Sequence, residues 1–359
     1  MSNIFARSPY IIEIDETGQT ASKVELYLWN GTGSAPASPQ YTLTKSIPAS
    51  NNLQTLYDIS PYIREYITHL SYTNNYNSNT TSTPTSEWCN VRVKRYKVVV
   101  GVATLLDTTD YYGFDGYTLY EDGSNHDLGN YHLDTGTYYY PYDADIDLTQ
   151  PSGVLYNGGV ITTYLLSNYD VRYTELNTGN TYINTITTNG WKNIYRIYPL
   201  YYDNGNLVEI RDASDVVLWS FTMKPKCVPK YVPVTCDFVN RYGAWERLWF
   251  FASSNESINV SNSEYNLMQS TLPNYDVKEG QKQVFNINGS KSIKVNTDWV
   301  SESYKNTIQD LMLSQRILID NKPAKINTKS TELYKSINTK MINYQLEFEF
   351  TYNIINSVL

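Results

Sequence analysis

The run from residue 344 to residue 354 constrains the fold more than any other segment. Apolar and polar side chains alternate through it without a break. The apolar positions are Tyr344, Leu346, Phe348, Phe350, Tyr352 and Ile354, and the polar ones are Gln345, Glu347, Glu349, Thr351 and Asn353. Successive side chains of a strand point to opposite faces, so the pattern predicts a half-buried β-strand with one apolar and one acidic face. The acidic face has two alternative environments: solvent, or a basic strand such as residues 92–97.

The first hundred residues predict a β-sandwich with one short helix, assigned here to residues 1–103. Alternating or β-branched runs predict strands at residues 10–15, 23–29, 41–45 and 88–100. A helix is expected over residues 59–67, where Ser60 can act as the N-cap and Pro61 suits the first helical turn. The polar, low-complexity segment 73–86 is expected to be an exposed loop.

Residues 104–225 form a Tyr- and Asp-rich β region, either an insertion in the first sandwich or a second β domain. Strands are expected at residues 191–198 and 207–211, on either side of a turn at 201–205, and again at 216–221. Three regularly spaced prolines, Pro225, Pro229 and Pro233, then predict a stiff connection and the best domain boundary in the chain.

Residues 226–359 are expected to form a C-terminal α+β domain. Its core would contain Trp245, Trp249, Phe251 and Phe348. Apolar side chains recur every three or four residues between Asp298 and Gln315, which predicts the one substantial helix with Asp298 as its N-cap. The fold class predicted for the whole chain is therefore mainly β, with two or three β-sandwich-like domains.

Composition narrows the function classes. The chain has 28 Lys and Arg and 36 Asp and Glu residues, for a net charge of −8. We therefore expect neither sequence-specific nor broad nucleic-acid binding, because both need concentrated positive charge. We expect no membrane span, because no stretch of about 18 apolar residues occurs. The first residues lack the basic and apolar regions of a signal peptide, which favours assembly in cytoplasm. The 35 tyrosines suit surfaces that are neither fully buried nor fully wet, such as large sheets, subunit interfaces and sugar-binding surfaces.

Metal binding has only weak candidates, and no cofactor is expected. Asp143, Asp145 and Asp147 resemble the start of a calcium loop, but Leu148 and Val154 stand where an EF-hand needs Gly and Glu. Solvated acidic turns are the simpler interpretation of this segment. His126 and His132 lie near Asp127 and Asp134 at a spacing that fits no common metal site, and the three cysteines indicate neither a disulfide framework nor a zinc site.

No catalytic signature is present in the sequence. It contains no nucleophile elbow, phosphate-binding loop or dinucleotide fingerprint. A carboxylate pair for glycoside hydrolysis stays open as an alternative, because such pairs are close in space rather than in sequence. The tyrosine-rich turns between residues 111 and 142 could stack on sugars or pack between subunits, and the interface is favoured.

Several strings carry a family resemblance. They are residues 238–250 (FVNRYGAWERLWF), residues 309–323 (QDLMLSQRILIDNKP), the last strand, residues 8–12 and residues 24–31. Together they resemble uncharacterised structural proteins of tailed bacteriophages that infect Bacteroidota, including crAss-like and flavobacterial phages. The resemblance spans both ends of the chain and weakens through residues 104–190. It implies a virion component in the tail, its ring or hub, or the baseplate, and it carries over no catalytic residue.

The resulting expectation is a non-enzymatic structural protein of the virion tail, assembled in the host bacterial cytoplasm. Its partners would be copies of itself in a ring-like homo-oligomer and other tail proteins, because rings close through head-to-tail contacts between copies. Two alternatives remain: a receptor- or glycan-binding protein at the tail tip that recognises a host surface glycan, and a depolymerase.

Overall fold

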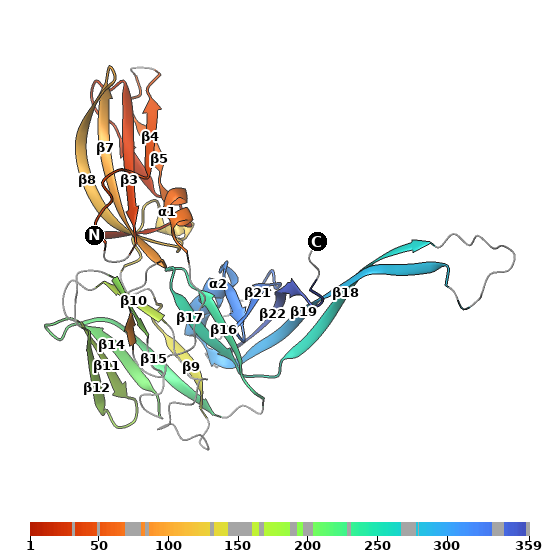
Figure 1. The fold of residues 1–359 in the computed structure, drawn as a ribbon. Coiled ribbons are helices and arrows are strands. Elements are labelled where there is room, and N and C mark those ends of the chain that lie inside the picture. The colour runs from red at the N-terminus through yellow and green to blue at the C-terminus, as the bar shows by residue number, and fades with distance from the viewer. Residues whose placement is uncertain are drawn as a thin grey trace. The chain divides into compact units, whose positions relative to one another are not determined.

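The computed structural model describes residues 1–30, 33–48, 51–68, 80–82, 86–129, 133–142, 160–164, 169–186, 192–196, 204–227, 231–266, 278, 280–331 and 341–356. Within them the chain is mainly β, with strands β1 to β22 and only two α-helices (Figure 1). Contacts divide the chain into two compact units. Unit 1 comprises residues 1–228, 237–248 and 303–314, and unit 2 comprises residues 229–236, 249–302 and 315–359.

The first sheet of unit 1 has five strands in the order β1-β8-β7-β3-β4. These are β1 (Ser2–Phe5), β8 (Val102–Phe114), β7 (Trp88–Val99), β3 (Ala21–Trp29) and β4 (Tyr41–Ser46). β1 pairs with β8 in parallel, and the other pairs are antiparallel. The strands expected at residues 23–29, 41–45 and 88–100 therefore form one sheet.

A second layer completes the expected sandwich with its short helix. It consists of the antiparallel pair β2 (Ile11–Ile14) and β5 (Thr55–Asp58), followed by α1 (Ser60–Tyr66). Side chains of this layer share one buried cluster with those of β3 and β7, among them Ile12, Tyr57, Ile63, Leu26 and Val91.

Two details of this layer differ from the sequence prediction. Ile59, not Ser60, is the N-cap of α1. Asp58 Oδ1 takes the capping role, because it accepts bonds from the Ser60 amide at 3.0 Å and the Ser60 hydroxyl at 2.7 Å. Where the helix lies against the sheet, a Cβ added to Gly113 would meet Ile63 Cγ2 at 2.5 Å, so glycine permits the close approach of α1 to β8.

The remaining sheets of unit 1 come mostly from the Tyr- and Asp-rich region, and β6 joins one of them from residues 80–82. One has the order β12-β11-β14-β15-β9, formed by β12 (Thr181–Ile186), β11 (Tyr169–Glu175), β14 (Asn206–Arg211), β15 (Val217–Cys227) and β9 (Thr137–Tyr142). The other has the order β10-β13-β6, formed by β10 (Val160–Tyr164), β13 (Lys192–Arg196) and β6 (Thr80–Ser82). A 3₁₀ turn spans Tyr120–Asp122.

These strands confirm one expectation and correct another. β13 and β14 are the strands expected near residues 191–198 and 207–211, and they belong to different sheets. β6 lies inside the segment expected to be a loop, because its backbone pairs with β13 despite its polar sequence.

A seven-stranded sheet follows, in the order β17-β16-β20-β21-β22-β19-β18. Its strands are β17 (Trp245–Phe250), β16 (Val234–Val239), β20 (Ile317–Ile319), β21 (Lys322–Ile326), β22 (Met341–Asn353), β19 (Lys282–Ser301) and β18 (Asn255–Asn266). The boundary between the units passes through β16 and β17. The expected three-part division of the chain stays a prediction.

The alternation that predicted β22 is confirmed as far as Phe350. Tyr344, Leu346, Phe348 and Phe350 are buried, and the Phe348 ring lies 6.0 Å from the ring of Phe250. The predicted core residues Trp245, Trp249, Phe251 and Phe348 are all buried, although Trp245 belongs to unit 1. The last two apolar positions, Tyr352 and Ile354, are exposed.

The helix begins later than the sequence predicts. β19 continues to Ser301, a 3₁₀ turn covers Glu302–Tyr304, and α2 spans Lys305–Met312. Asp298 is not an N-cap: it adopts a positive φ of 57° at an irregularity where β19 pairs with β22. Pairing with β22 extends over Trp299 to Ser301, and it overrides the helical spacing of the apolar side chains there.

Candidate assembly surface

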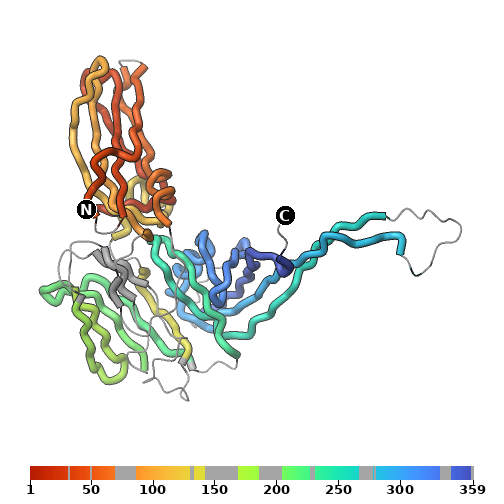
Figure 2. The backbone as a smooth tube through the Cα atoms, viewed as in Figure 1, coloured from red at the N-terminus to blue at the C-terminus, as the bar shows by residue number. Residues whose placement is uncertain are grey.

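The outer part of the seven-stranded sheet lies in unit 2, and we call it the arm. It consists of β18, residues 255–266, and the residues of β19 that pair with it, 282–294 (Figures 1 and 2). β22 pairs with β19 only from Ser290 onward, so residues 260–266 and 282–289 continue past the end of β22 as a two-stranded ribbon. All twelve residues of β18 are exposed. Both faces of β18 are therefore in contact with solvent.

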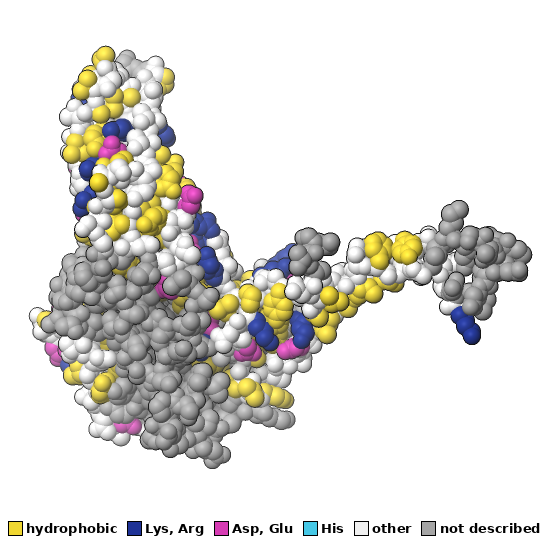
Figure 3. All heavy atoms as spheres, viewed as in Figure 1, with side chains coloured by type: hydrophobic (Ala, Val, Ile, Leu, Met, Phe, Trp, Pro, Cys, Tyr) yellow, Lys and Arg dark blue, Asp and Glu magenta, His cyan; other side chains and the backbone are white. Residues whose placement is uncertain are grey.

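Exposed apolar side chains lie along the arm (Figure 3). On one face Ile258 and Val260 are 60% and 67% exposed. Gly289 is the register partner of Val260, and a Cβ built there would lie 3.6 Å from Ile258 and 3.2 Å from Ile354. The exposed end of β22 thus joins this apolar face.

The opposite face of the arm carries two aromatic rings. Tyr265 and Phe285 meet edge to face with their centroids 5.6 Å apart, and the Tyr265 hydroxyl donates to Gln283 Oε1 at 2.6 Å. Both rings are more than two-fifths exposed. Asn286, next to Phe285, has a φ of 51° where the register between β18 and β19 shifts, which marks a β-bulge.

The two-stranded outer part of the arm is poorly stabilised by itself. A two-stranded sheet is marginal in water unless a third strand or another layer supports it. Exposed apolar side chains in a contiguous patch indicate a surface that binds another molecule. The edge strand β18 contains neither Lys nor Pro, the residues with which proteins usually prevent edge-to-edge pairing. The arm has the properties of an association surface.

The acidic face of β22 has its own counter-ions. Glu347 lies 3.4 Å from Lys294 on β19, and Glu349 lies 3.2 Å from Lys325 on β21. The basic strand β7 is likewise paired locally: Arg92 contacts Asp110 at 2.7 Å, and Arg95 binds Asp107. Both strands therefore have nearby partners of opposite charge, and the acidic face needs no basic strand from elsewhere.

The three calcium candidates, Asp143, Asp145 and Asp147, lie outside the described residues, and so does His132. His126 is exposed. Among the residues described, no group of three or more His, Cys, Asp or Glu side chains is arranged to hold a metal ion. Cys89 and Cys236 are buried thiols that take part in no disulfide.

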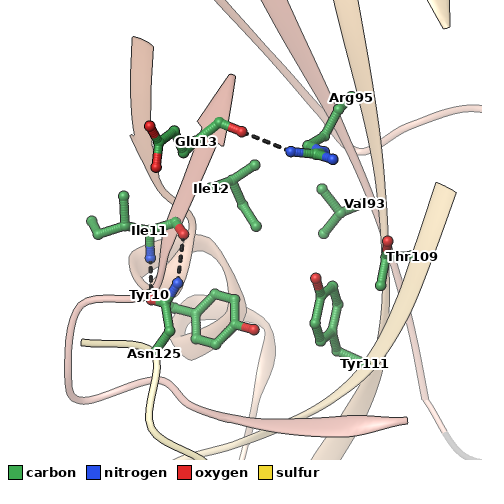
Figure 4. Close-up of a pocket in the computed structure, with 9 residues that line it drawn as sticks. All are labelled: Tyr10, Ile11, Ile12, Glu13, Val93, Arg95, Thr109, Tyr111 and Asn125. Carbon is green, nitrogen blue, oxygen red and sulfur yellow. Dashed lines mark hydrogen bonds between the residues drawn. The ribbon is translucent and has the colours of Figure 1, made fainter. Parts of the chain in front are cut away.

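A small pocket of about 250 Å³ lies between β2, β7 and β8 (Figure 4). The rings of Tyr10 and Tyr111 form one wall, with their centroids 5.6 Å apart. Burial, together with the neighbouring Tyr111 hydroxyl, raises the pKa of Tyr10. Arg95 Nη1 donates to the Glu13 carbonyl at 2.8 Å, and the Asn125 amide exchanges two 2.7 Å bonds with the backbone of Ile11. The pocket thus offers aromatic faces, while its amide and guanidinium groups are engaged by the protein.

Unit 1 contains a carboxylate cluster that the sequence did not indicate: Glu246 and Asp310, which are buried, and Asp134, which is half-buried. Tyr242 donates to Asp134 at 2.7 Å, Tyr117 donates to Asp310 at 3.1 Å, and the Arg241 amide donates to Asp310 at 3.2 Å.

Burial raises the pKa of all three carboxyls. Burial and then the nearby Asp134 carboxylate raise the pKa of Asp310 to about 7. Burial raises the pKa of Glu246 well above its usual value, although a hydrogen bond donated by the Asn240 side-chain amide acts to lower it. Glu246 Oε1 is buried without a hydrogen-bond partner. Proton uptake by this cluster therefore favours the folded state.

The arm could have been found from sequence. Residues 255–264 alternate between Asn or Ser at the odd positions and mostly larger side chains at the even ones. That period predicts a strand. Whether that strand is exposed depends on where β22 ends, and the alternation of side chains does not show this. The carboxylates left no comparable signal, because they are far apart in the chain.

No family model matches the chain, and no curated protein matches it. Within the part of the chain that is described, no helix is long and apolar enough to cross a bilayer.

Proposed function

We propose that this chain is a non-enzymatic structural component of a phage virion tail. It assembles in the host bacterial cytoplasm into a ring, hub or baseplate through β-rich interfaces, with copies of itself and with other tail proteins. The resemblance of its two ends to structural proteins of phages infecting Bacteroidota supports this proposal. The single observation that carries it is the arm, whose apolar side chains Ile258 and Val260 are exposed.

The physical argument concerns the free energy of the isolated chain. Complete burial of an exposed aliphatic side chain by a partner contributes roughly 1.5–3 kcal/mol of favourable free energy to the association. An arm with exposed apolar side chains on both faces thus favours association over the free state. A wholly soluble, monomeric function would leave this surface unexplained.

The test is self-association together with a search for the protein in particles. The purified chain should form oligomers whose fraction rises with protein concentration, measured by sedimentation velocity, and mass spectrometry of purified virions should detect it. The double variant Ile258→Asn/Val260→Asn should weaken association at least tenfold with an unchanged circular dichroism spectrum. Ser257→Asn, on the other face of the same strand, is the matched control. A chain that is monomeric at high concentration and absent from virions contradicts the proposal.

A second candidate function is recognition of a host surface glycan at the tail tip. The observation that favours it is the pocket between β2, β7 and β8, because sugars stack on tyrosine rings such as Tyr10 and Tyr111. Glycan-array binding that is lost in Tyr111→Ala and kept in Tyr120→Ala, an exposed tyrosine outside the pocket, would support it. An array without any bound glycan would remove it.

A further inference from the structure

The outer edge of β18 is the open end of the seven-stranded sheet. β18 is last in the strand order, and within the described residues no strand pairs with its outer side. Every second residue of such an edge directs its N–H and C=O groups away from the sheet. The strand at the other end of the sheet, β17, is by contrast buried along its whole length. The free backbone groups of this sheet are concentrated on β18.

The side chains of β18 are complementary to a second β18 in the antiparallel direction. We propose that two copies of this chain associate through β18, with residue i of one copy opposite residue 518 − i of the other, so that Asn259 faces Asn259 of the partner copy on a two-fold axis. In this register Ile258 faces Val260 of the partner copy twice. Glu256 faces Asn262 of the partner copy, so no two charges oppose one another.

The two neighbouring registers that keep the same faces together are less favourable. With Val260 on the axis, Glu256 of each copy would face Glu264 of the partner copy, and like charges directly opposite one another destabilise a sheet. The favoured register pairs residues 255–263, a stretch of about 30 Å at the usual rise per residue. With Ile258 on the axis, Val260 of each copy would instead face Glu256 of the partner copy, an apolar side chain opposite a charge. The match of Ile258 with Val260 and the absence of Glu–Glu pairs together favour the register with Asn259 on the axis.

This inference rests on the proposed function, since it names the partner and the geometry at the same arm. Pairing of one patch with itself is isologous and closes after two copies. A ring of more than two copies would combine this contact with a second one elsewhere on the chain. The contact extends the sheet of each copy into the sheet of the other and covers both open edges.

Single cysteines test the register directly. Antiparallel partners have Cα atoms about 4.5 or 5.5 Å apart, within the range that a disulfide spans. In the full-length chain with Cys227→Ser, Asn259→Cys should give a disulfide-linked dimer under mild oxidation, with at least a tenfold higher yield than Ser263→Cys. Ser263 faces residue 255 of the partner copy in this register, so its cysteine has no cysteine opposite it. Circular dichroism of the reduced variants checks that each is folded.

The outcomes separate the two proposals. Crosslinking of Val260→Cys in place of Asn259→Cys overturns this register. A chain that oligomerises but forms no Asn259→Cys crosslink overturns β18 pairing and leaves the proposed function standing. A chain that neither oligomerises nor occurs in virions overturns both.

Discussion

Phe348 and Glu347 are neighbours in β22 that point to opposite faces. Phe348 is fully buried against Phe250, whereas Glu347 lies on the outer face beside Lys294. Phe348→Asp should lower the free energy of unfolding by about 3–5 kcal/mol, because it removes a core ring and places a charge in the core. Glu347→Gln should change it by less than about 1 kcal/mol, as exposed ion pairs contribute little. Urea unfolding of the two variants measures both, and equal losses would contradict the face assignment.

The carboxyl of Asp310 makes the stability of unit 1 depend on pH. Its pKa in the folded state, about 7, lies above its usual value of 3.8, so its contribution to stability is fully present below pH 4 and is lost as the pH rises through 7. A shift of this size corresponds to roughly 4 kcal/mol at about 1.4 kcal/mol per pKa unit. Glu246 and Asp134 are shifted in the same direction.

Asp310→Asn tests this dependence. The variant should unfold with a flatter pH profile between pH 4 and pH 8 than the natural chain, because the amide does not titrate. Glu121→Gln, at an exposed carboxyl of the same unit, should keep the natural profile. Thermal unfolding at several pH values provides the measurement, and identical profiles for Asp310→Asn and the natural chain would rule out this role for Asp310.

At the scale of elements, β16 and β17 are joined by a buried ion pair. Asp237 accepts two bonds from Arg247, at 2.6 and 2.7 Å, and neither side chain is exposed to solvent by more than 1%. Removing one partner of a buried pair leaves the other charge uncompensated, which costs about 3–5 kcal/mol. Arg247→Met should therefore be strongly destabilising.

Replacing both partners should cost less than replacing one. The double variant Arg247→Met/Asp237→Leu leaves no unpaired charge, so it should recover much of the stability lost in Arg247→Met. A double-mutant cycle in urea measures the coupling. Simple additivity of the two single changes would show that the pair contributes no specific stabilisation.

The elements also show which sequence patterns were sufficient to locate a strand or a helix. Period-two alternation located β3, β4, β7 and β22 to within a few residues, because half-buried strands leave that pattern directly. The helical spacing between residues 298 and 315 predicted α2 but placed its start too early. Val300 is buried within β19. A buried strand position and a buried helix position both select an apolar side chain, so spacing alone cannot separate them.

At the scale of the whole chain, the two units are interleaved in sequence. Unit 1 takes residues 237–248 and 303–314 from the region that the sequence assigned to a C-terminal domain. A fragment of residues 226–359 would separate Trp245 and the carboxylates of Glu246 and Asp310 from the rest of unit 1. We expect this fragment to be aggregation-prone and to lack cooperative unfolding, in contrast to the full chain.

Expression of the fragment beside the full chain checks this, with near-ultraviolet circular dichroism and a thermal scan. A fragment that is monodisperse and unfolds cooperatively would show that residues 226–359 form an independent domain, as the proline spacing predicts.

The sequence by itself determined the mainly β class, most strands of the first sheet and the buried face of β22, because these follow from local alternation of side chains along an extended backbone. Only the tertiary structure decided where α2 begins, how the units share the chain, that three distant carboxyls meet in one cluster, and that Tyr352 and Ile354 continue the apolar pattern of β22 into solvent. The physical reason is that each of these depends on which segment lies opposite. The sequence pattern around an apolar side chain such as Ile258 does not show whether its own chain buries it or leaves it exposed to a partner.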